Sequence, residues 1–315
     1  MRVAVFGAGL MGHALALVYA LGGHAVRLTD SDPATLARAP RQMQTALATL
    51  RDGGEVAASW TDARLAAAVT CCKTVADTLA GAELVVEAIT EQPDAKRALY
   101  AEIDSLAPMD LVIASNTSGL DIFPLVPERR QARTLIAHWY SPPYLVDLCD
   151  IVGSPRTEPA AIEMVRRVVA DMGKVPVVMQ KFIPGYIANR VQGAIWLEVT
   201  MLLDEGYATP RDIDAAIIHG LALRMPILGH LAKADFMGLM LIYDGMRTAT
   251  YQPPVQQRHS TVLDALIANG RTGVLAGGGY FDWSERDPDQ WFAERDRKLV
   301  ALKRALREIG TLQGA

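Results

Sequence analysis

The chain begins with a glycine pattern that strongly restricts how it can fold. An apolar run over residues 2–7 predicts a buried strand, residues 11–22 predict a helix, and residues 25–30 predict a second strand. The turn between the first strand and the helix has glycine at three positions: Gly7, Gly9 and Gly12. This spacing in a β-α-β unit is typical of dinucleotide binding. The glycines permit a tight turn, close approach of the backbone to a pyrophosphate, and close packing of helix on sheet.

Asp30 ends the second predicted strand and indicates which dinucleotide is bound. A carboxylate at this point accepts hydrogen bonds from the adenosine ribose and repels the 2′-phosphate of NADP. The alternative is that Asp30 only caps the turn before Pro33. The helix N-terminus offers unpaired N–H groups to the phosphates, so we expect NAD as the cofactor, with Leu10 and Met11 of the same turn beside it.

Predicted strands and helices continue to alternate as far as residue 179. Further strands are predicted over residues 69–72, 83–87, 111–115, 135–138, 149–152 and 175–179. Helices are predicted between them, two in an antiparallel hairpin over residues 33–68 and one each over residues 95–106 and 158–172. This alternation indicates an α/β fold with a parallel, doubly wound sheet of the Rossmann type.

The pattern changes near residue 184. Residues 186–267 are almost wholly helical in pattern, and residues 289–312 predict a charged final helix. The helical stretch is interrupted at turn-forming residues, namely Gly206, Thr209, Pro210, Gly220 and Pro226. We therefore expect an NAD-binding Rossmann domain over residues 1–183 and a smaller, all-helical domain over residues 184–315.

Composition limits the partners that such a chain can have. Of its 315 residues half are hydrophobic, and the formal net charge of −4 gives no electrostatic reason to expect a nucleic-acid partner. The three cysteines form no C-x-x-C pair and the six histidines show no ligand spacing, so we expect no metal. The sequence begins without a signal peptide and has no apolar run of membrane-spanning length, which predicts a soluble, cytoplasmic protein.

His138 ends an apolar strand and is a candidate general base. An imidazole suits proton transfer near neutral pH because its unperturbed pKa is about 6.5. Asp150 lies inside the following predicted strand, and a parallel or antiparallel return of the chain can bring its carboxylate to the imidazole. Such a carboxylate fixes the tautomer and stabilises the imidazolium. The alternative is a structural histidine bonded to the backbone.

Two further sets of polar side chains are candidates for the same site. Asn116, Thr117 and Ser118 follow the strand over residues 111–115, and ligands bind at such strand ends in open α/β sheets. Small polar residues also cap helices, which is the alternative for these three. Asn189 opens the first helix of the second domain and is a potential hydrogen-bond donor over the crevice. Its alternative is a polar residue in the seam between domains.

Six motifs of this chain stand in the order found in one known family. They are Gly7-Ala-Gly-Leu-Met-Gly12, Val86-Glu87-Ala-Ile-Thr-Glu91 with Lys96, Ala114-Ser-Asn-Thr-Ser118, His138-Trp-Tyr-Ser-Pro142-Pro143, Pro184-Gly-Tyr-Ile-Ala-Asn-Arg190 and Gly278-Gly-Tyr-Phe-Asp-Trp283. On these motifs the chain resembles the 3-hydroxyacyl-CoA dehydrogenase family over essentially its whole length. The resemblance implies a Rossmann domain followed by a helical domain that forms a homodimer.

The resemblance also implies roles for individual residues. His138 corresponds to the catalytic base that takes the hydroxyl proton, and Asp150 stands where the family has a glutamate paired with that base. Ser118 and Asn189 correspond to residues that hydrogen-bond the reacting oxygen and steady the histidine. Contacts with the cofactor are implied, on its nicotinamide side, for Glu91, Lys96, Ser118 and Ser141.

The chain departs from the family pattern at three places. Asp150 keeps the charge of the family's glutamate but loses a methylene of reach. Ser141 replaces an asparagine, which weakens one expected nicotinamide contact. A lysine expected just before the glycine-rich turn near residue 277 is missing.

Substrates of this family divide between acyl-CoA thioesters and small free acids. Residues 42–68 contain Arg51 and Arg64 but no lysine, which argues against CoA because its phosphates need cations. Residues 219–231 resemble the branch of gulonate, lambda-crystallin-like and carnitine dehydrogenases. Arg224 in this segment can form a bidentate pair with a substrate carboxylate, and an exposed or dimer-interface salt bridge is the alternative.

These observations predict an NAD-dependent dehydrogenase that oxidises a secondary alcohol with a His–Asp pair as general base. The substrate is expected to be a 3-hydroxy acid or a related small carboxylated alcohol. Trp139 and Tyr140 stand beside His138 and either line the substrate pocket or belong to the core. The first alternative is an L-3-hydroxyacyl-CoA dehydrogenase. The second is a non-catalytic NAD-binding protein like the lens crystallins of the family.

Overall fold

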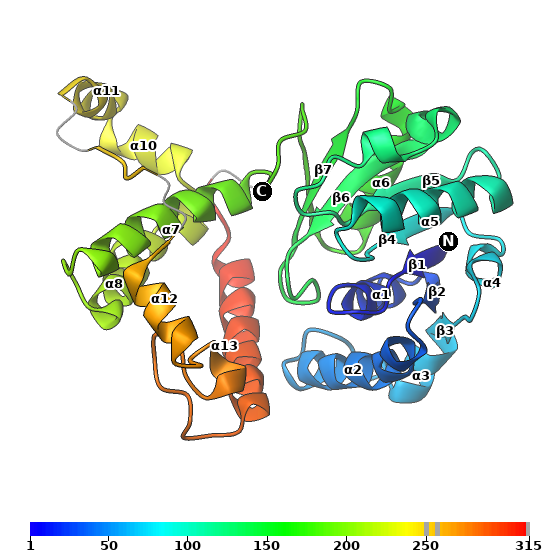
Figure 1. Ribbon diagram of the computed structural model, residues 1–315, viewed down its shortest axis with the longest axis horizontal. Helices are drawn as coiled ribbons and strands as arrows, with labels where there is room; N and C mark the ends of the chain where they lie inside the picture. Colours follow the sequence, from blue (N-terminus) through cyan, green and yellow to red (C-terminus); the bar gives the residue numbers. More distant parts are fainter. Residues whose placement is uncertain (249–251, 256–258, 313–315) are drawn as a thin grey trace. The chain divides into compact units, whose positions relative to one another are not determined.

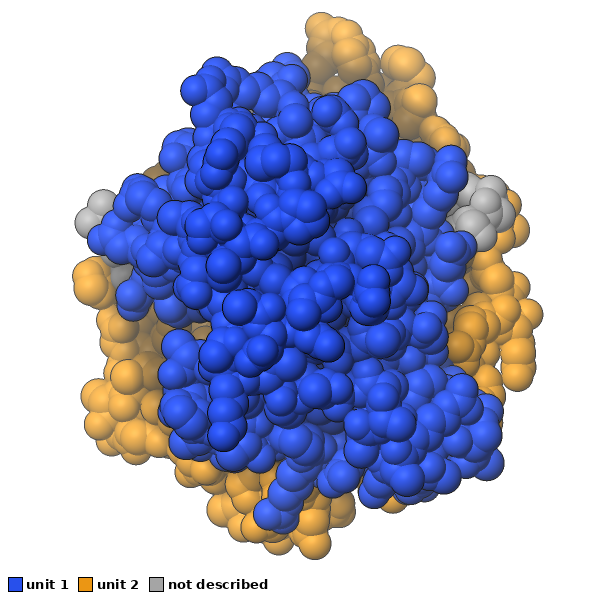
Figure 2. Space-filling model, turned by 90° about the vertical axis from the view of Figure 1, so that its right-hand side faces the viewer, with its two compact units in different colours: residues 1–188 blue, residues 189–315 orange. Residues whose placement is uncertain are grey.

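The computed structural model describes residues 1–248, 252–255 and 259–312. The chain divides into two compact units, residues 1–188 and residues 189–315 (Figure 2). The boundary expected from the sequence falls between residues 183 and 184, just before the first helix of the second unit.

Unit 1 is built on an eight-stranded sheet in the order β3-β2-β1-β4-β5-β6-β7-β8 (Figure 1). The strands are β1 (Arg2–Phe6), β2 (Ala25–Thr29), β3 (Val69–Cys71), β4 (Leu84–Glu87), β5 (Val112–Ser115), β6 (Thr134–Trp139), β7 (Leu148–Gly153) and β8 (Val175–Val178). The chain order reverses between β1 and β4, which is the switch point at which doubly wound sheets bind nucleotides. The predicted Rossmann-type architecture is confirmed.

One pair of strands departs from the prediction of a parallel sheet. β6 and β7 run antiparallel, with Leu135 opposite Gly153 and Trp139 opposite Cys149. Residues 140–147 join them without a helix, and a parallel crossover needs a longer connection. The return is therefore antiparallel, and it sets residues of the two strands directly opposite each other.

Helices cover both faces of this sheet. They are α1 (Gly12–Leu21), α2 (Pro33–Asp52), α3 (Asp62–Ala68), α4 (Val75–Leu79), α5 (Pro93–Leu106) and α6 (Pro159–Asp171), with two 3₁₀ turns, η1 (Phe123–Leu125) and η2 (Glu128–Arg133). α2, α5 and α6 each begin at proline, whose fixed φ suits the first helical turn. The short α4 and the 3₁₀ turns are absent from the prediction, since they are too short to show a hydrophobic period.

The core of unit 1 holds the ends of the central strands in place. α1 is buried from Gly12 to Ala20 because it lies between the sheet and the neighbouring α2 and α3. A second cluster packs Val85, Ile113 and Ile136 of adjacent strands against α5 and against Tyr186. This packing fixes the carboxyl ends of β1, β4, β5 and β6, from which the candidate site is built.

Unit 2 is helical, as predicted. Its elements are α7 (Ala188–Asp204), α8 (Pro210–Ala216), the π-helix η3 (Ile217–Ala222), α9 (Met225–Leu228), α10 (Leu231–Met237), α11 (Leu239–Thr248), α12 (Thr261–Ala268), the 3₁₀ turn η4 (Val274–Ala276) and α13 (Pro288–Ile309). The break expected at Gly220 is wrong, because this glycine continues the helix as part of η3. Residues 249–251 and 256–258 of the predicted helical stretch lie outside the described residues.

Among the helices in the described ranges, none is by itself both long and apolar enough to cross a membrane. Residues Pro210–Leu228 and Leu231–Met237 meet the criteria of length and composition only as a pair, and that pair is bent by 102°.

Candidate active site

The glycine turn after β1 is shaped by two close approaches of the backbone. Gly7 has φ +94°, and a Cβ there would lie 2.4 Å from the carbonyl oxygen of Ala88. A Cβ on Gly12 would lie 1.7 Å from the carbonyl oxygen of Gly7. A Cβ on Gly9 would meet no described atom within 4 Å. Gly7 and Gly12 are therefore required by the fold, whereas Gly9 faces open space of the kind that a bound pyrophosphate would fill.

The N-terminus of α1 is left open toward that space. Met11, at the N-cap, makes no side-chain capping bond, and the first turn carries no acid. Leu10 of the same turn is three-quarters exposed. Uncapped N–H groups and the positive end of the helix dipole favour an anion at this position.

Asp30 is held at the tip of β2 by two backbone donors. The amide of Ala8 donates to Oδ2 at 2.6 Å, and the amide of Asp32 donates to Oδ1 at 2.8 Å. The helix that follows is capped by Asp32, whose carboxylate accepts from Ala34 and Thr35. Asp30 thus ties the glycine turn to β2, and its half-buried carboxylate retains lone pairs for ribose hydroxyls.

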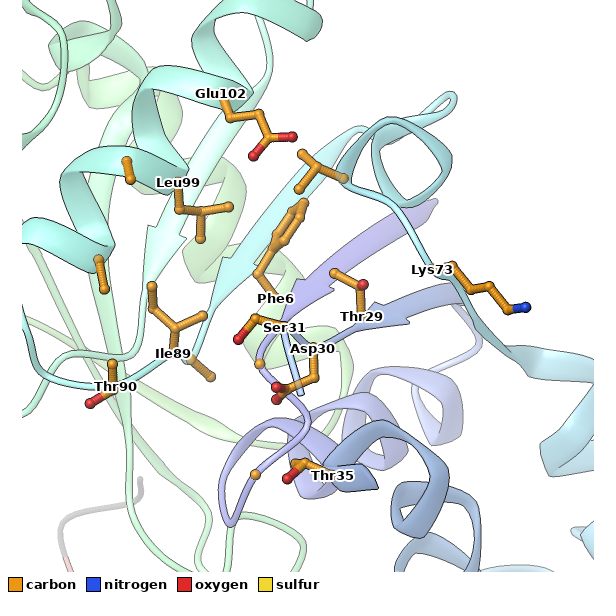
Figure 3. Close-up of a pocket in the computed structure, with 16 residues that line it drawn as sticks. Phe6, Thr29, Asp30, Ser31, Thr35, Lys73, Ile89, Thr90, Leu99 and Glu102 are labelled. Carbon is orange, nitrogen blue, oxygen red and sulfur yellow. The ribbon is translucent and has the colours of Figure 1, made fainter. Parts of the chain in front are cut away.

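A cavity of about 510 Å³ opens between these elements (Figure 3). Asp30 and Thr29 line it from the end of β2, Thr35 from α2, and Leu99 and Glu102 from α5. Gly7 and Gly9 form part of the same wall. The cavity, the open Gly9 and the acceptor Asp30 fit the adenosine and pyrophosphate portions of NAD.

Glu87 anchors a buried polar cluster beneath the cofactor region. Its Oε1 accepts from Lys96 Nζ at 2.7 Å, and its Oε2 accepts from Tyr100 at 2.7 Å and from Ser115 at 2.5 Å. Lys96 is only 1% exposed, and its ammonium also lies 3.6 Å from Glu91. Lys96 therefore positions two carboxylates, and its expected contact with the cofactor stays a prediction.

Glu91 links the loop after β4 to the loop after β5. Its Oε1 accepts from the amide of Ser118 at 2.5 Å, and its Oε2 accepts from the hydroxyl of Thr117 at 2.8 Å. Thr117 in turn accepts a 2.5 Å bond from the hydroxyl of Tyr186 at its carbonyl. Asn116 accepts from the amide of Trp139, so it fixes β5 to β6. The predicted Asn-Thr-Ser motif thus joins three motifs rather than capping a helix.

His138 and Asp150 lie directly opposite each other on β6 and β7. Both side chains are buried, at 3% and 0% exposure. Nδ1 of His138 and Oδ1 of Asp150 are each buried without a hydrogen-bond partner among the described residues. Burial lowers the pKa of His138 from 6.5 to about 4 and raises the pKa of Asp150. The antiparallel return sets the two residues opposite each other, and these two atoms are not hydrogen-bonded to each other in the structure.

Two tyrosine rings enclose the imidazole of His138. Tyr186 stacks on it at 4.5 Å between ring centroids, and Tyr140 meets it edge-on at 4.6 Å. Tyr186 has φ +50°, the one positive value among non-glycine residues in the described ranges. The sequence shows Tyr186 only as part of a motif, because the stacking depends on a turn that periodicity does not reveal. The sequence signal for this turn was the Pro184-Gly185 pair directly before Tyr186, and Gly185 also has positive φ.

Comparison with known proteins identifies the family. The family model described as "3-hydroxyacyl-CoA dehydrogenase, NAD binding domain" matches residues 2–182. The model described as "3-hydroxyacyl-CoA dehydrogenase, C-terminal domain" matches residues 185–283. The chain belongs to the 3-hydroxyacyl-CoA dehydrogenase family. It is an NAD-dependent dehydrogenase, in agreement with the glycine turn and Asp30.

Relatives of this chain include dehydrogenases named for small molecules. The L-carnitine dehydrogenase of Streptomyces coelicolor is 35% identical over 321 residues, 98% of this chain and 96% of the relative. Lambda-crystallin of Oryctolagus cuniculus is 29% identical over 232 residues, 73% and 72% of the two chains. The solved structure of 5-formyl-3-hydroxy-2-methylpyridine 4-carboxylic acid 5-dehydrogenase, described as an NAD⁺-dependent dismutase, has a TM-score of 0.86. It is 27% identical and covers 97% of this chain and 98% of its own.

The three residues that follow His138 have different surroundings. Trp139 is 2% exposed and packs against Tyr19 at 6.1 Å, so it belongs to the core. Its side chain alternates with that of His138 along β6 and therefore points to the other face of the sheet. Ser141 is exposed. Tyr140 shares the face of His138, and its hydroxyl donates to Asp150.

The remaining predicted residues of this family member lie in unit 2. Asn189 is the second residue of α7 and is partly exposed. Arg224 is exposed at the start of α9 and donates to the carbonyl of Gly220 at 2.8 Å. Arg271 donates to the carbonyl of Gly279 and so holds the glycine-rich turn.

Proposed function

We propose that this chain oxidises the secondary alcohol of a small carboxylated molecule with NAD, and that His138 is the general base. The observation that supports this is the pairing of His138 with Asp150 across β6 and β7. A proton on Nδ1, donated to Oδ1 of Asp150, would satisfy both of the buried atoms that have no partner in the described chain. This tautomer leaves Nε2 as the acceptor.

The chemistry of the proposed reaction follows from that tautomer. Nε2 of His138 takes the proton of the substrate hydroxyl, and the ionised Asp150 stabilises the resulting imidazolium. When bound by the glycine turn and Asp30, NAD would supply the acceptor for the hydride of the carbon that carries the hydroxyl. Ser118 and Asn189 hydrogen-bond the reacting oxygen. The lowered pKa of His138 keeps the imidazole neutral, and so able to accept a proton, throughout the neutral range.

Small free acids are the proposed substrates rather than CoA thioesters. The phosphates of CoA need cations, and residues 42–68 contain two arginines and no lysine. Arg64 lies over the ring of Trp60 at 4.2 Å and donates to Ser59. In unit 2, Arg224 uses one guanidinium nitrogen on Gly220 and keeps further N–H groups for a carboxylate. The relatives named for L-carnitine and for a pyridine carboxylic acid support the same class.

A panel of alcohols tests the function. L-carnitine, 3-hydroxybutyrate, L-gulonate and 3-hydroxybutyryl-CoA are each incubated with NAD, and NADH appearance is measured. Turnover of a free acid well above that of the thioester supports the proposal. Preference for the thioester establishes the L-3-hydroxyacyl-CoA alternative. Tight NADH binding with no turnover of any alcohol, in the wild type as in His138→Gln, establishes a crystallin-like role.

We further propose that unit 2 forms a homodimer. Large apolar side chains are exposed along α10 and α11, including Leu231, Phe236, Met240 and Met246, each at least 66% exposed. Several large apolar side chains exposed on neighbouring helices favour a contact with another protein chain. Light scattering should give a dimer for the wild type and a monomer for a Phe236→Glu, Met240→Glu double variant. A monomeric wild type at micromolar concentration would refute the dimer.

A further inference from the structure

Tyr140 makes a contact that the proposed base pair does not explain. Its hydroxyl donates to Oδ2 of Asp150 at 2.6 Å, and the edge of its ring lies against His138. Tyr140 and His138 are two positions apart in an extended segment, so both side chains project from the same face of the sheet. One tyrosine thus contacts both members of the pair.

Because of this contact, the two carboxylate oxygens of Asp150 differ in their hydrogen bonding. Oδ2 is occupied by Tyr140, and Oδ1 is the buried atom that lacks a partner in the described chain. The carboxylate cannot rotate freely without breaking a hydrogen bond from a neutral donor to an ionised acceptor, which is among the stronger kinds. Only Oδ1 therefore remains to accept a proton from Nδ1 of His138.

We infer that Tyr140 is a positioning residue, which holds the short side chain of Asp150 so that its free oxygen orients His138 as the base. The inference rests on the proposed function of His138. It assigns Tyr140 a role through Asp150 and not through the substrate. Tyr186, the other ring on His138, uses its hydroxyl on the carbonyl of Thr117, so the hydroxyl of Tyr140 is the one that reaches the pair.

The surroundings of the pair determine the expected pH response. Titratable groups lie beside His138 or Asp150 on the neighbouring elements: Glu91 after β4, Tyr140 after β6 and Tyr186 before α7. Cys149 precedes Asp150 on β7, and its side chain points to the opposite face of the sheet. The hydroxyl of Tyr140 lowers the pKa of Asp150, against the rise caused by burial. Removing the hydroxyl favours protonated Asp150, so the acid limb of the kcat/KM profile should move to higher pH.

A double-mutant cycle with Tyr140→Phe and Asp150→Asn tests the inference. The acid of the panel that is oxidised fastest serves as substrate. Tyr140→Phe should lower kcat about tenfold, the effect of one hydrogen bond of about 1.4 kcal/mol, with little change in either KM. In the Asp150→Asn background the same change should have no further effect, because Tyr140 acts only through the carboxylate. Tyr207→Phe is the control, since Tyr207 is 71% exposed in unit 2.

A second measurement needs no turnover. NMR of the isotope-labelled imidazoles, with the signal of His138 assigned by its loss in His138→Gln, reports which ring nitrogen carries the proton. The Nδ1–H tautomer should dominate in the wild type with NADH bound and lose its dominance in Tyr140→Phe. Tyr207→Phe should retain the wild-type tautomer.

The outcomes distinguish failure of the role of Tyr140 from failure of the proposed role of His138. A wild-type kcat and tautomer in Tyr140→Phe, together with an inactive His138→Gln, would overturn the role of Tyr140 alone. Effects that multiply in the double variant would also overturn it, since Tyr140 would then act outside Asp150. Full activity of His138→Gln would remove the proposed base and the inference with it.

Discussion

The two units of this chain differ in how they bury their apolar side chains. Unit 1 packs a continuous core on both sides of its sheet, from Val5 on β1 to Val165 on α6. In the described part of unit 2, Ile213 and Val300 are the large apolar side chains that are buried, whereas Trp196, Phe236 and Met246 are exposed. Unit 1 therefore has a hydrophobic core of its own, whereas many of the apolar side chains that could form a core in unit 2 are exposed.

This difference separates what each unit can contribute to the reaction. A dense core fixes the strand ends, so the polar side chains beyond them are positioned closely enough to form hydrogen bonds. Glu91 and Asp30, which both accept from backbone amides, are examples. An open helical unit instead offers apolar surface for association and single polar groups such as Arg224. We therefore expect chemistry and cofactor binding to respond to changes in unit 1, and substrate choice and assembly to changes in unit 2.

The largest effect is expected at His138. The variant His138→Gln keeps a polar side chain of similar size but cannot take a proton at neutral pH. The rate constant kcat should fall by about a thousandfold, while the Kd of NADH from a fluorescence titration stays within about twofold. A loss of less than about tenfold would mean that the base lies elsewhere and would weaken the assignment of the chemistry to unit 1.

Matched glycine substitutions should expose the difference in packing directly. Gly12→Ala places a Cβ 1.7 Å from a backbone oxygen, so the free energy of unfolding should fall by about 3 kcal/mol, measured by urea denaturation. Gly9→Ala meets no described atom, so it should leave that free energy nearly unchanged but weaken NADH binding about tenfold or more. Gly220→Ala, in the open unit 2, should change neither quantity.

The contrary results are equally informative. Unchanged NADH affinity in Gly9→Ala would show that the dinucleotide does not approach the backbone there. A large loss of stability in Gly220→Ala would show that unit 2 packs more tightly around η3 than its exposed surface indicates.

The same difference explains how far the sequence predicts the structure. The strands of unit 1 follow from apolar runs and turn residues, and the glycine turn and Asp30 follow from spacing, whereas the order of the strands in the sheet was not predicted. The side-chain contacts of His138 do not follow, because they depend on the antiparallel return after β6 and on the left-handed turn at Tyr186. Trp139 illustrates the limit: neighbouring residues of one strand point to opposite faces, so proximity in sequence to His138 does not place it in the site.

Acid should destabilise the protein through His138. Burial depresses its pKa from 6.5 to about 4, so between these values the unfolded chain binds a proton that the folded chain does not. Stability is then lost as the pH falls through this window, by up to about 3 kcal/mol. Urea denaturation of the wild type and of His138→Gln at several pH values isolates this contribution, because His13 and His24, whose pKa values are also lowered, are common to both. Parallel curves for the two proteins would show that His138 does not titrate in this way.

The smallest effect is expected in unit 2, at Arg224. Arg224→Lys keeps the charge but loses the planar fork that binds a carboxylate in two places. The KM of the preferred acid should rise about tenfold, a loss of about 1.4 kcal/mol, with kcat and the Kd of NADH unchanged. Arg211→Lys on the exposed start of α8 is the matched control and should leave the KM at its wild-type value. If Arg224→Lys instead changes the mass in solution and leaves the KM unaltered, the guanidinium belongs to the interface between copies. The residues that determine substrate specificity would then lie at the strand ends of unit 1. Unit 1 would in that case supply substrate recognition as well as the chemistry.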